Sequence, residues 1–333
     1  MIIDSFLFFQ ELDLLEIRLE YLDPIVDKFI ILEANQSFKG SKKDFIFEKN
    51  KERYQKYIDK IYYYKILDNH YDFESLMIYL KSSKNVTLNM IMKFMKKHEY
   101  YDKDNLSHIL DTYHRECLHI PLLDKCEEDD LVIISDLDEI PDFKTIKLLK
   151  NGMNNKNTYR LIQHEFQFFL NCYSNSNWKG SIISPYKILK NKSLNNLRRD
   201  SPSIKTILNA GYHFTSIGDL KSIRNKIKSW AHQEFNHPLI KRNLAKNIMH
   251  GKDIFYRFNK NKNKVLSLNN YDILDQRIIK VIKNYDHLFI KYIQRNHIFN
   301  LKYKAYQFIF LFIRFIKNPL KALKKIIKLS LFR

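Results

Sequence analysis

Alternating apolar and polar stretches at the start of the chain predict a strand, a helix and a second strand. Residues 2–9 are rich in β-forming side chains, and the segment from residue 11 to 21 predicts a helix, with Leu15, Leu19 and Leu22 on one face. Pro24 would end that helix. Residues 28–32 form a run of strand length in which four apolar residues follow Lys28, and this is typical of a buried parallel strand. This order predicts a right-handed βαβ unit.

The rest of the pattern extends this α/β prediction. It predicts further strands at residues 62–67, 131–134, 159–170 and 182–189, and helices at residues 106–126, 142–150 and 223–235. Residues 36–60 indicate a loop and a surface helix, and residues 70–105 show no clean periodicity. Because no repeat or linker is evident, we expect one α/β domain over residues 1–285, followed by a helical basic extension over residues 286–333.

Composition agrees with a folded protein whose excess charge is unevenly spread. The 333 residues are 45% hydrophobic and include only 6 Gly and 7 Pro, which argues against a disordered or fibrous chain. The formal net charge is +20, yet residues 287–333 carry eleven Lys and Arg and no Asp or Glu. Over half of the excess positive charge therefore lies in this short terminal segment, which favours a surface-binding tail.

The tail has the pattern of an interfacial amphipathic helix. After Pro319, Leu320, Leu323 and Ile327 fall on one helical face while most lysines fall elsewhere. This pattern indicates peripheral binding to an anionic membrane, close to lipid-linked glycans. A helix packed on the domain with a solvated basic face is the alternative.

The cysteines and the N-terminus favour a cytoplasmic protein on the inner face of the cell membrane. Cys117, Cys126 and Cys172 form no CxxC pair and cannot all pair with one another, as expected in a reducing compartment. The first residues lack a signal-peptide pattern, and residues 306–316 are too short to span a bilayer.

An acidic cluster directly follows the apolar run at residues 131–134. Asp136 and Asp138 alternate by two, so in an extended chain both reach the same side, and Glu139 comes next. Ligands bind at the carboxyl ends of strands in open α/β sheets, and paired carboxylates suit Mg²⁺ or Mn²⁺. Such a cation would neutralise a pyrophosphate. The alternative is an acidic turn that caps the next helix.

Motifs that are missing narrow the chemistry. The sequence has no GxxxxGK[ST], GxGxxG, HExxH or GxSxG, which argues against P-loop kinases, dinucleotide enzymes and two classes of hydrolase. A metal in place of a glycine-rich loop to handle the diphosphate is typical of nucleotide-sugar transferases. Two alternatives stay open: a nucleotidyltransferase of similar fold, and a basic nucleic-acid-binding protein. Because no nucleic-acid motif is present, we expect no nucleic-acid partner.

Three segments resemble glycosyltransferase family 17, which includes the enzyme that adds bisecting N-acetylglucosamine to glycoproteins. They are DSFLFFQELDLLEIRLEYLDPIVDKFIILEAN (4–35), DDLVIISDLDEIPD (129–142) and GYHFTSIGDLKSIRNKIKSWAHQEFN (211–236), with a looser match at FLNCYSNSNWKG (169–180). The resemblance implies a GT-A-like, Rossmann-type mixed sheet and an inverting transfer from UDP-N-acetylglucosamine or a related donor to a glycan. Tyr212 stands where the family usually has Trp, and the membrane anchor of Golgi members is absent.

Site roles follow from this resemblance and from the chemistry. The metal residues are Asp136, Asp138 and His213, where a core histidine is the alternative for His213. Asp136 is also a candidate for contact with the donor's ribose. An inverting transfer needs a carboxylate base, and the candidates are Glu165, Glu234, Asp219 and Glu139.

Further residues are candidates for donor and sugar binding. At the end of the second strand, Glu33 and Asn35 are placed to contact the uridine, or else they are simple polar caps. Arg115 is suited to pair with a diphosphate, or else it is a surface charge. Trp178 and Trp230 are suited to stack on sugar rings, although tryptophan is more often buried in a core.

Overall fold

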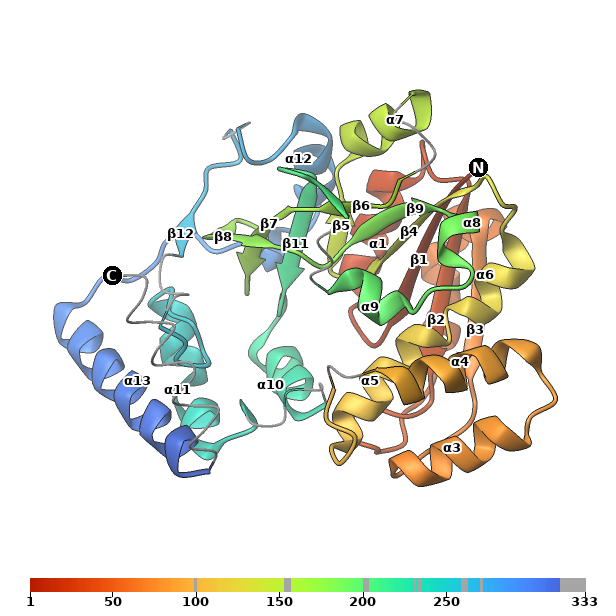
Figure 1. Ribbon diagram of the computed structural model, residues 1–333. Coiled ribbons are helices and arrows are strands. Elements are labelled where there is room, and N and C mark those ends of the chain that lie inside the picture. Colours follow the sequence, from red (N-terminus) through yellow and green to blue (C-terminus); the bar gives the residue numbers. More distant parts are fainter. Residues whose placement is uncertain are drawn as a thin grey trace.

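The computed structural model describes residues 1–98, 101–152, 157–199, 204–229, 232, 235–258, 263–269 and 272–317. Within this part of the chain, two β-sheets are surrounded by helices (Figure 1). The α/β class with a mixed sheet flanked by helices is confirmed. The finer GT-A-like assignment and the division at residue 285 stay predictions.

The larger sheet has seven strands among the described residues, in the order β10-β6-β9-β4-β1-β2-β3. Its neighbours β4, β1, β2 and β3 run parallel, and β9 lies antiparallel between β4 and β6. The strands are β1 (Ile2–Phe8), β2 (Lys28–Ala34), β3 (Ile61–Ile66), β4 (Leu131–Asp136), β6 (Tyr159–Leu161), β9 (Ile182–Pro185) and β10 (Lys205–Ile207). Because the parallel strands all end at one edge, their carboxyl ends define where a ligand is expected.

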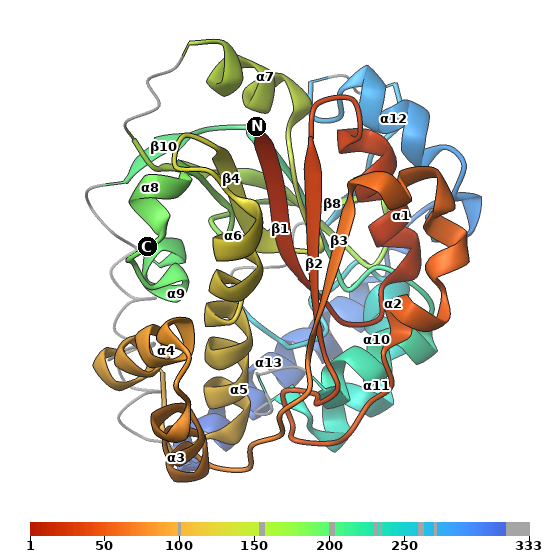
Figure 2. The same cartoon turned by 90° about the vertical axis from the view of Figure 1, so that its right-hand side faces the viewer.

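Helices cover both faces of the parallel strands, which explains why β1, β2 and β4 are buried almost throughout. Figure 2 shows α1, α2 and α12 on one side and α4, α5 and α6 on the other. The helices of this region are α1 (Leu12–Leu22), α2 (Ile46–Lys49), the 3₁₀ helix η1 (Lys51–Lys60), α3 (Phe73–Ser82), α4 (Val86–Lys97), α5 (Leu106–Glu116), α6 (His119–Lys125), α7 (Phe143–Asn151), α8 (Tyr186–Leu189), α9 (Leu194–Arg198), α12 (Gln276–Ile282) and the 3₁₀ helix η3 (Asp286–Leu288).

The smaller sheet brings acidic and basic positions into register. Its described strands follow the order β12-β8-β7-β11-β5, with bounds β5 (Glu139–Pro141), β7 (Gln163–Gln167), β8 (Cys172–Trp178), β11 (Gly211–Thr215) and β12 (Lys264–Val265). On β11, His213 pairs with Glu139 of β5 on one side and with Glu165 of β7 on the other. Residues far apart in the sequence therefore meet on neighbouring strands.

A third group of helices packs beside the smaller sheet. It consists of α10 (Leu220–Ser229), α11 (Pro238–Met249) and α13 (His297–Lys317), and α13 lies at the outer edge of the molecule (Figure 1). Buried apolar side chains from all three helices form one cluster that also contains Phe168, Phe235 and Phe255. Across the part of the chain that the structure describes, no helix is both long and apolar enough to cross a bilayer. The amphipathic helix expected after Pro319 lies outside the described residues.

Some elements differ from the sequence prediction for identifiable reasons. The strand expected at residues 182–189 ends at Pro185, because Tyr186 and Leu189 are buried on the same side of a short helix. The expected strand at residues 159–170 divides into β6 and β7, which belong to different sheets. Residues 70–105 contain α3 and α4, each of which begins at a capping residue, Asp72 or Asn85.

Candidate active site

A cavity of about 640 Å³ lies at the carboxyl ends of the parallel strands. Its floor includes Leu7 of β1, Ala34 of β2, Ile66 of β3 and Asp136 of β4. Charged and polar side chains of other elements complete the wall, among them Glu11, Lys43, Asp111, His114, Arg115, Asp138, Glu165, Trp178, Asn195, Arg198, His213, Lys226 and Arg257. This is the edge at which open α/β sheets bind ligands.

The acidic turn that leads from β4 into β5 is held from behind by one arginine. Arg18 of α1 is 0% exposed and forms a double ion pair with the equally buried Asp4, at 2.6 and 2.8 Å. Its Nη1 donates to the backbone oxygens of Asp136, Leu137 and Glu139 at 2.9–3.0 Å, and its Nη2 also donates to Ser135 Oγ at 2.6 Å. Since the carbonyl groups of Asp136, Leu137 and Glu139 share one donor nitrogen, the conformation of the turn depends on this side chain.

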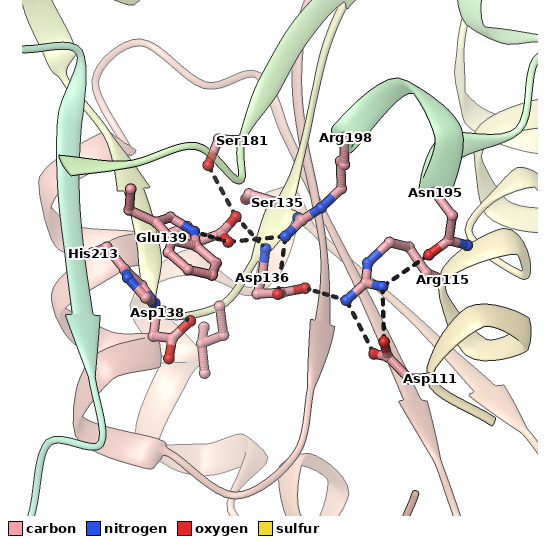
Figure 3. A network of polar contacts seen from close by, with 12 residues as sticks. Asp111, Arg115, Ser135, Asp136, Asp138, Glu139, Ser181, Asn195, Arg198 and His213 are labelled. Atoms are coloured by element: carbon pink, nitrogen blue, oxygen red, sulfur yellow. Dashed lines mark hydrogen bonds and ion pairs between the residues drawn. The ribbon is translucent and has the colours of Figure 1, made fainter. Parts of the chain in front are cut away.

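Asp136 sits between two guanidinium groups (Figure 3). Its Oδ1 accepts from Arg115 Nη2 at 2.9 Å and its Oδ2 from Arg198 Nη2 at 3.0 Å. Arg115 is oriented in turn by Asp111 and Asn195. Burial alone would raise the pKa of Asp136, but the charges of Arg115 and Arg198 hold it well below its usual range. Asp136 therefore stays ionised and pairs with cations of the chain itself.

Asp138 points to another part of the same cavity, toward His213 (Figure 3). Its Oδ1 lies 3.7 Å from His213 Nε2, and its Oδ2 accepts from Lys226 Nζ of α10 at 2.9 Å. Lys226 also lies 3.2 Å from Glu11. Burial would lower the pKa of Lys226, but the carboxylates of Asp138 and Glu11 raise it above its usual value. The lysine is thus a fixed positive charge at the cavity wall.

Glu139 lies beneath the cavity wall, at 0% exposure, and ties three segments together. Its carboxylate accepts from Trp178 Nε1 at 2.5 Å, Arg198 Nη2 at 2.9 Å and Ser181 Oγ at 3.1 Å. Gly180 makes room for this arrangement, because a Cβ there would lie 2.0 Å from Glu139 Oε1. These contacts orient the turn and occupy both carboxylate oxygens of Glu139.

Glu165 is the predicted base that the structure brings to the cavity. Its side chain is 2% exposed and lies on β7 beside His213 of β11. Gln167 Nε2 donates to Oε1 at 2.6 Å and Ser176 Oγ donates to Oε2 at 2.9 Å. These bonds hold the carboxylate in one orientation at the cavity wall.

The residues present fit the predicted divalent cation in part. Asp138 and His213 offer an oxygen and an imidazole nitrogen on the same wall, and Mg²⁺ or Mn²⁺ is often held by one or two protein ligands together with substrate phosphates. Both oxygens of Asp136 already accept from arginines, so this side chain is not poised as a ligand. Among the described residues, no group of three or more His, Cys, Asp or Glu side chains is arranged to hold a metal.

Several predicted site residues lie away from the cavity lining. Glu33 is fully buried and accepts from Lys43, Tyr63 and the backbone N–H groups at the start of α2. Asn35 donates to the carbonyl of Leu67 and does not line the cavity. Asp219 is exposed and caps α10 by accepting from Ser222 N at 2.7 Å. Glu234 and Trp230 lie outside the described residues.

Three functional side chains were not predicted as such. Arg18 shares a helix with the leucines that face the core, and a charged residue on an apolar face was the available signal. Arg198 and Lys226 had no comparable signal, because each is one of many basic residues in its segment. Trp178, in contrast, was singled out, and its ring stacks on that of His213 with 4.4 Å between centroids.

Comparisons with known proteins bear on this geometry. A family model described as glycosyltransferase family 17 matches residues 1–102 and 79–262. A search of curated proteins found no match. Among solved structures, the crystal structure of HddC from Yersinia pseudotuberculosis is similar at 10% identity and a TM-score of 0.31, covering 62% of this chain and 90% of that chain. A likeness as weak as this last one supports no argument.

Proposed function

Since the chain belongs to glycosyltransferase family 17 and is therefore a transferase of glycosyl groups, we propose that it moves N-acetylglucosamine from a UDP-sugar to a glycan acceptor, with inversion at the anomeric carbon and with the help of a divalent cation. The observation that carries this proposal is the composition of the cavity. At one sheet edge it combines carboxylates, a histidine and guanidinium groups, which are the groups that a diphosphate leaving group and an attacking hydroxyl require.

The arginines supply the charge for the donor diphosphate. Arg115 and Arg198 both line the cavity, and Nη1 of Arg198 has no hydrogen-bond partner among the described residues. A guanidinium group with an unused N–H favours a phosphate ligand, because bidentate pairing matches its planar geometry. When the donor binds, its phosphate oxygens compete with Asp136 for the same guanidinium groups. Asp136 then serves to keep both arginines in place before the donor arrives.

The metal role falls to Asp138 and His213. A bound Mn²⁺ or Mg²⁺ supplies positive charge beside the diphosphate. Asp138 would contribute an oxygen and His213 a ring nitrogen, and Lys226 donates to the other oxygen of Asp138. The stacking of Trp178 on His213 fixes the plane of the imidazole. Asp136, which both the acidic motif and the resemblance suggested as a ligand, acts through the arginines in this scheme.

Glu165 is our choice for the base. The acceptor hydroxyl oxygen forms a bond to the anomeric carbon while its proton passes to the carboxylate of Glu165. The bond from the anomeric carbon to the donor phosphate breaks at the same time, and its electron pair leaves on UDP. Gln167 and Ser176 orient the carboxylate for this transfer. Arg257 lies on the same cavity wall, where burial lowers its pKa but the carboxylates of Asp253 and Glu165 raise it above its usual value.

Product analysis tests the proposal. The protein is incubated with UDP-N-acetylglucosamine, a panel of glycans and Mn²⁺, and the released phosphorus compound is identified by chromatography. We expect UDP, a product with an inverted anomeric centre by NMR, and loss of turnover with EDTA. Release of pyrophosphate from a nucleoside triphosphate and a sugar phosphate would instead establish a nucleotidyltransferase.

The base has its own test. Glu165→Gln should lower kcat by about a hundredfold or more while UDP affinity, measured by calorimetry, is retained. Loss of UDP binding in this variant would contradict the assigned role, because the carboxylate is proposed to act on the acceptor side.

A further inference from the structure

Helix α13 presents apolar side chains on two opposite faces. The inner face carries Tyr303 and Phe310, which are 2% and 3% exposed and pack into the cluster shared with α10 and α11. The outer face is solvent-exposed, and its side chains are 49% to 66% exposed: Ile298, Leu301, Phe308, Ile309, Phe312 and Ile316. With 3.6 residues per turn these positions form one stripe on the side away from Tyr303 and Phe310. We call them the outer stripe.

The outer stripe is too large to be incidental. It extends over nearly the whole 21-residue helix, or roughly 27 Å at about 1.5 Å per residue. Single exposed apolar side chains are ordinary, but a contiguous row of isoleucine, leucine and phenylalanine marks a binding surface. Apart from Phe308, whose ring centroid lies 5.5 Å from that of Phe258, the packing of α13 on the protein comes from the inner face, so the outer stripe is left for a partner.

Charge identifies that partner. From residue 287 to residue 333 the chain has eleven Lys and Arg and no Asp or Glu. On α13 itself, Lys302 and Lys304 are exposed beside the outer stripe. A second copy of the chain is disfavoured because it would bring two such basic segments together. Nucleic acid is disfavoured because it would leave the apolar side chains of the outer stripe exposed to water. An anionic lipid surface satisfies both features, because its headgroups pair with the lysines and its acyl chains accept the phenylalanines.

We propose that α13 lies in the interface of an anionic membrane with the outer stripe turned toward the acyl chains. The helix lies on the membrane and does not cross it, in keeping with the finding that no described helix could span a bilayer.

This docking has a consequence for the acceptor. The cluster beneath α13 includes Phe168, Phe235 and Phe255, and these three side chains also line the cavity. A docked α13 therefore keeps the cavity beside the lipid surface, as a glycan on a lipid carrier requires; this consequence rests on the proposed function.

Vesicle sedimentation of the full-length chain tests the proposal. Vesicles of phosphatidylcholine alone are compared with vesicles of equal parts phosphatidylcholine and phosphatidylglycerol. We expect binding to the anionic vesicles, weakened by salt, and little binding to the neutral ones. The double variant Phe312→Ser/Ile316→Ser should lower the partition coefficient by about tenfold or more.

A matched control separates this surface from general hydrophobicity. Leu123→Ser/Leu148→Ser removes two side chains that are 62% and 65% exposed on α6 and α7, against 64% and 65% for Phe312 and Ile316. The control should bind anionic vesicles like the wild type, and circular dichroism verifies that both double variants are folded.

Three results would overturn the proposal. The first is equal binding to neutral and anionic vesicles, or binding to neither. The second is unchanged binding of the Phe312→Ser/Ile316→Ser variant. The third is a wild-type dimer in solution that the Phe312→Ser/Ile316→Ser variant no longer forms, which would assign the outer stripe to a second copy of the chain. UDP release with a soluble acceptor is measured on the same variants, so that membrane docking can fail while the proposed transfer stands.

Discussion

The acidic turn has two sides that use the same ion-pair chemistry in different surroundings. On the buried side, Arg18 and Asp4 are 0% exposed, and Arg18 donates to Asp4, to Ser135 and to backbone oxygens of the turn. On the cavity side, Asp136 is 34% exposed and Asp138 is 13% exposed, and both pair with cations that line the cavity. The contacts of Arg18 are closed to solvent, whereas an entering ligand can replace one partner in the ion pairs of Asp136 and Asp138.

This difference indicates which contacts set the conformation of the turn and which contacts are available to a ligand. A buried charge that loses its partner stays uncompensated, so the buried side sets the conformation. The pairs at the cavity are partly exposed, so a ligand's phosphate or a cation can take the place of one partner. Substitutions on the two sides should therefore separate stability from activity.

The largest effect is expected at Arg18. Replacing it in Arg18→Met leaves the carboxylate of Asp4 buried without a counter-charge and the carbonyl groups of the turn without a donor. We expect a loss of about 3–5 kcal/mol in the free energy of unfolding, measured by urea titration.

Arg53→Met is the matched control for Arg18→Met. Arg53 also pairs with two carboxylates, Asp13 and Glu16, but its side chain is 33% exposed. That change should cost no more than about 1 kcal/mol. If Arg18→Met and Arg53→Met lowered the free energy of unfolding by similar amounts, the proposed difference between the buried side and the cavity side would be contradicted.

The next effect concerns activity and lies on the cavity side. Asp138→Asn keeps the size of the side chain but removes the charge that faces His213 and Lys226. We expect kcat to fall by about a hundredfold or more with Mn²⁺ present, because the proposed cation loses its oxygen ligand. The melting temperature should change little, and Mn²⁺ affinity, measured by electron paramagnetic resonance, should fall in parallel.

Asp129→Asn serves as the control for that experiment. Asp129 is a surface acid with 80% side-chain exposure that pairs with Lys187, far from the cavity lining. Its replacement should leave both kcat and Mn²⁺ affinity unchanged. Full activity in Asp138→Asn would exclude the proposed metal role of Asp138.

The strands and the helix around the turn could be predicted from the sequence, and so could several residues of the cavity wall, but the contacts between these residues could not. Apolar runs and helical periodicity are local signals, so β1, α1, β2 and β4 were placed to within about two residues. The position of Asp136 at a strand's carboxyl end followed from the same reasoning. Long-range contacts produce no local pattern in the sequence. Asp136, for example, pairs with Arg115 and Arg198, which are 21 and 62 residues away in the chain.

The residues that were misplaced show the same limit. Glu33 comes at the end of a strand, as a ligand-binding residue would, but its carboxylate is enclosed by Lys43, Tyr63 and the start of α2. Asp219 begins a helix, and an N-capping aspartate is indistinguishable in sequence from a catalytic one. Which acids face a cavity depends on packing between elements, and a single sequence does not specify that packing.

A smaller loss of stability is expected at Gly180, where the two sides of the turn meet. A Cβ at this position would lie 2.0 Å from Glu139 Oε1 and 2.2 Å from Trp178 Nε1. Gly180→Ala must therefore push these two side chains apart and break the hydrogen bond between them. We expect a cost of about 1–3 kcal/mol and a change in tryptophan fluorescence. Lys179→Ala, which adds no atom at the neighbouring position, should produce neither effect. An unperturbed Gly180→Ala variant would contradict the tight packing of Glu139.

The smallest effect is expected from the charge of Asp136, and it should depend on pH. Burial raises the pKa of Asp136, but Arg115 and Arg198 outweigh burial and hold the pKa below that of an unfolded aspartate, which is about 3.9. A carboxyl group of this kind stabilises the fold above the unfolded pKa and loses that contribution as the pH falls toward the folded one. Asp136→Asn should therefore be less stable than the wild type at neutral pH. The difference should narrow below about pH 4, where the wild-type carboxylate begins to take up a proton.

Urea unfolding at neutral pH and at several acidic values measures this difference in the free energy of unfolding. Asp129→Asn is the control, and it should follow the wild type at each pH because its ion pair is exposed to solvent. A difference that widened on acidification would mean that the arginines do not hold Asp136 in its charged form, and the cavity side of the turn would then lack the ion pairs that a donor phosphate is proposed to replace.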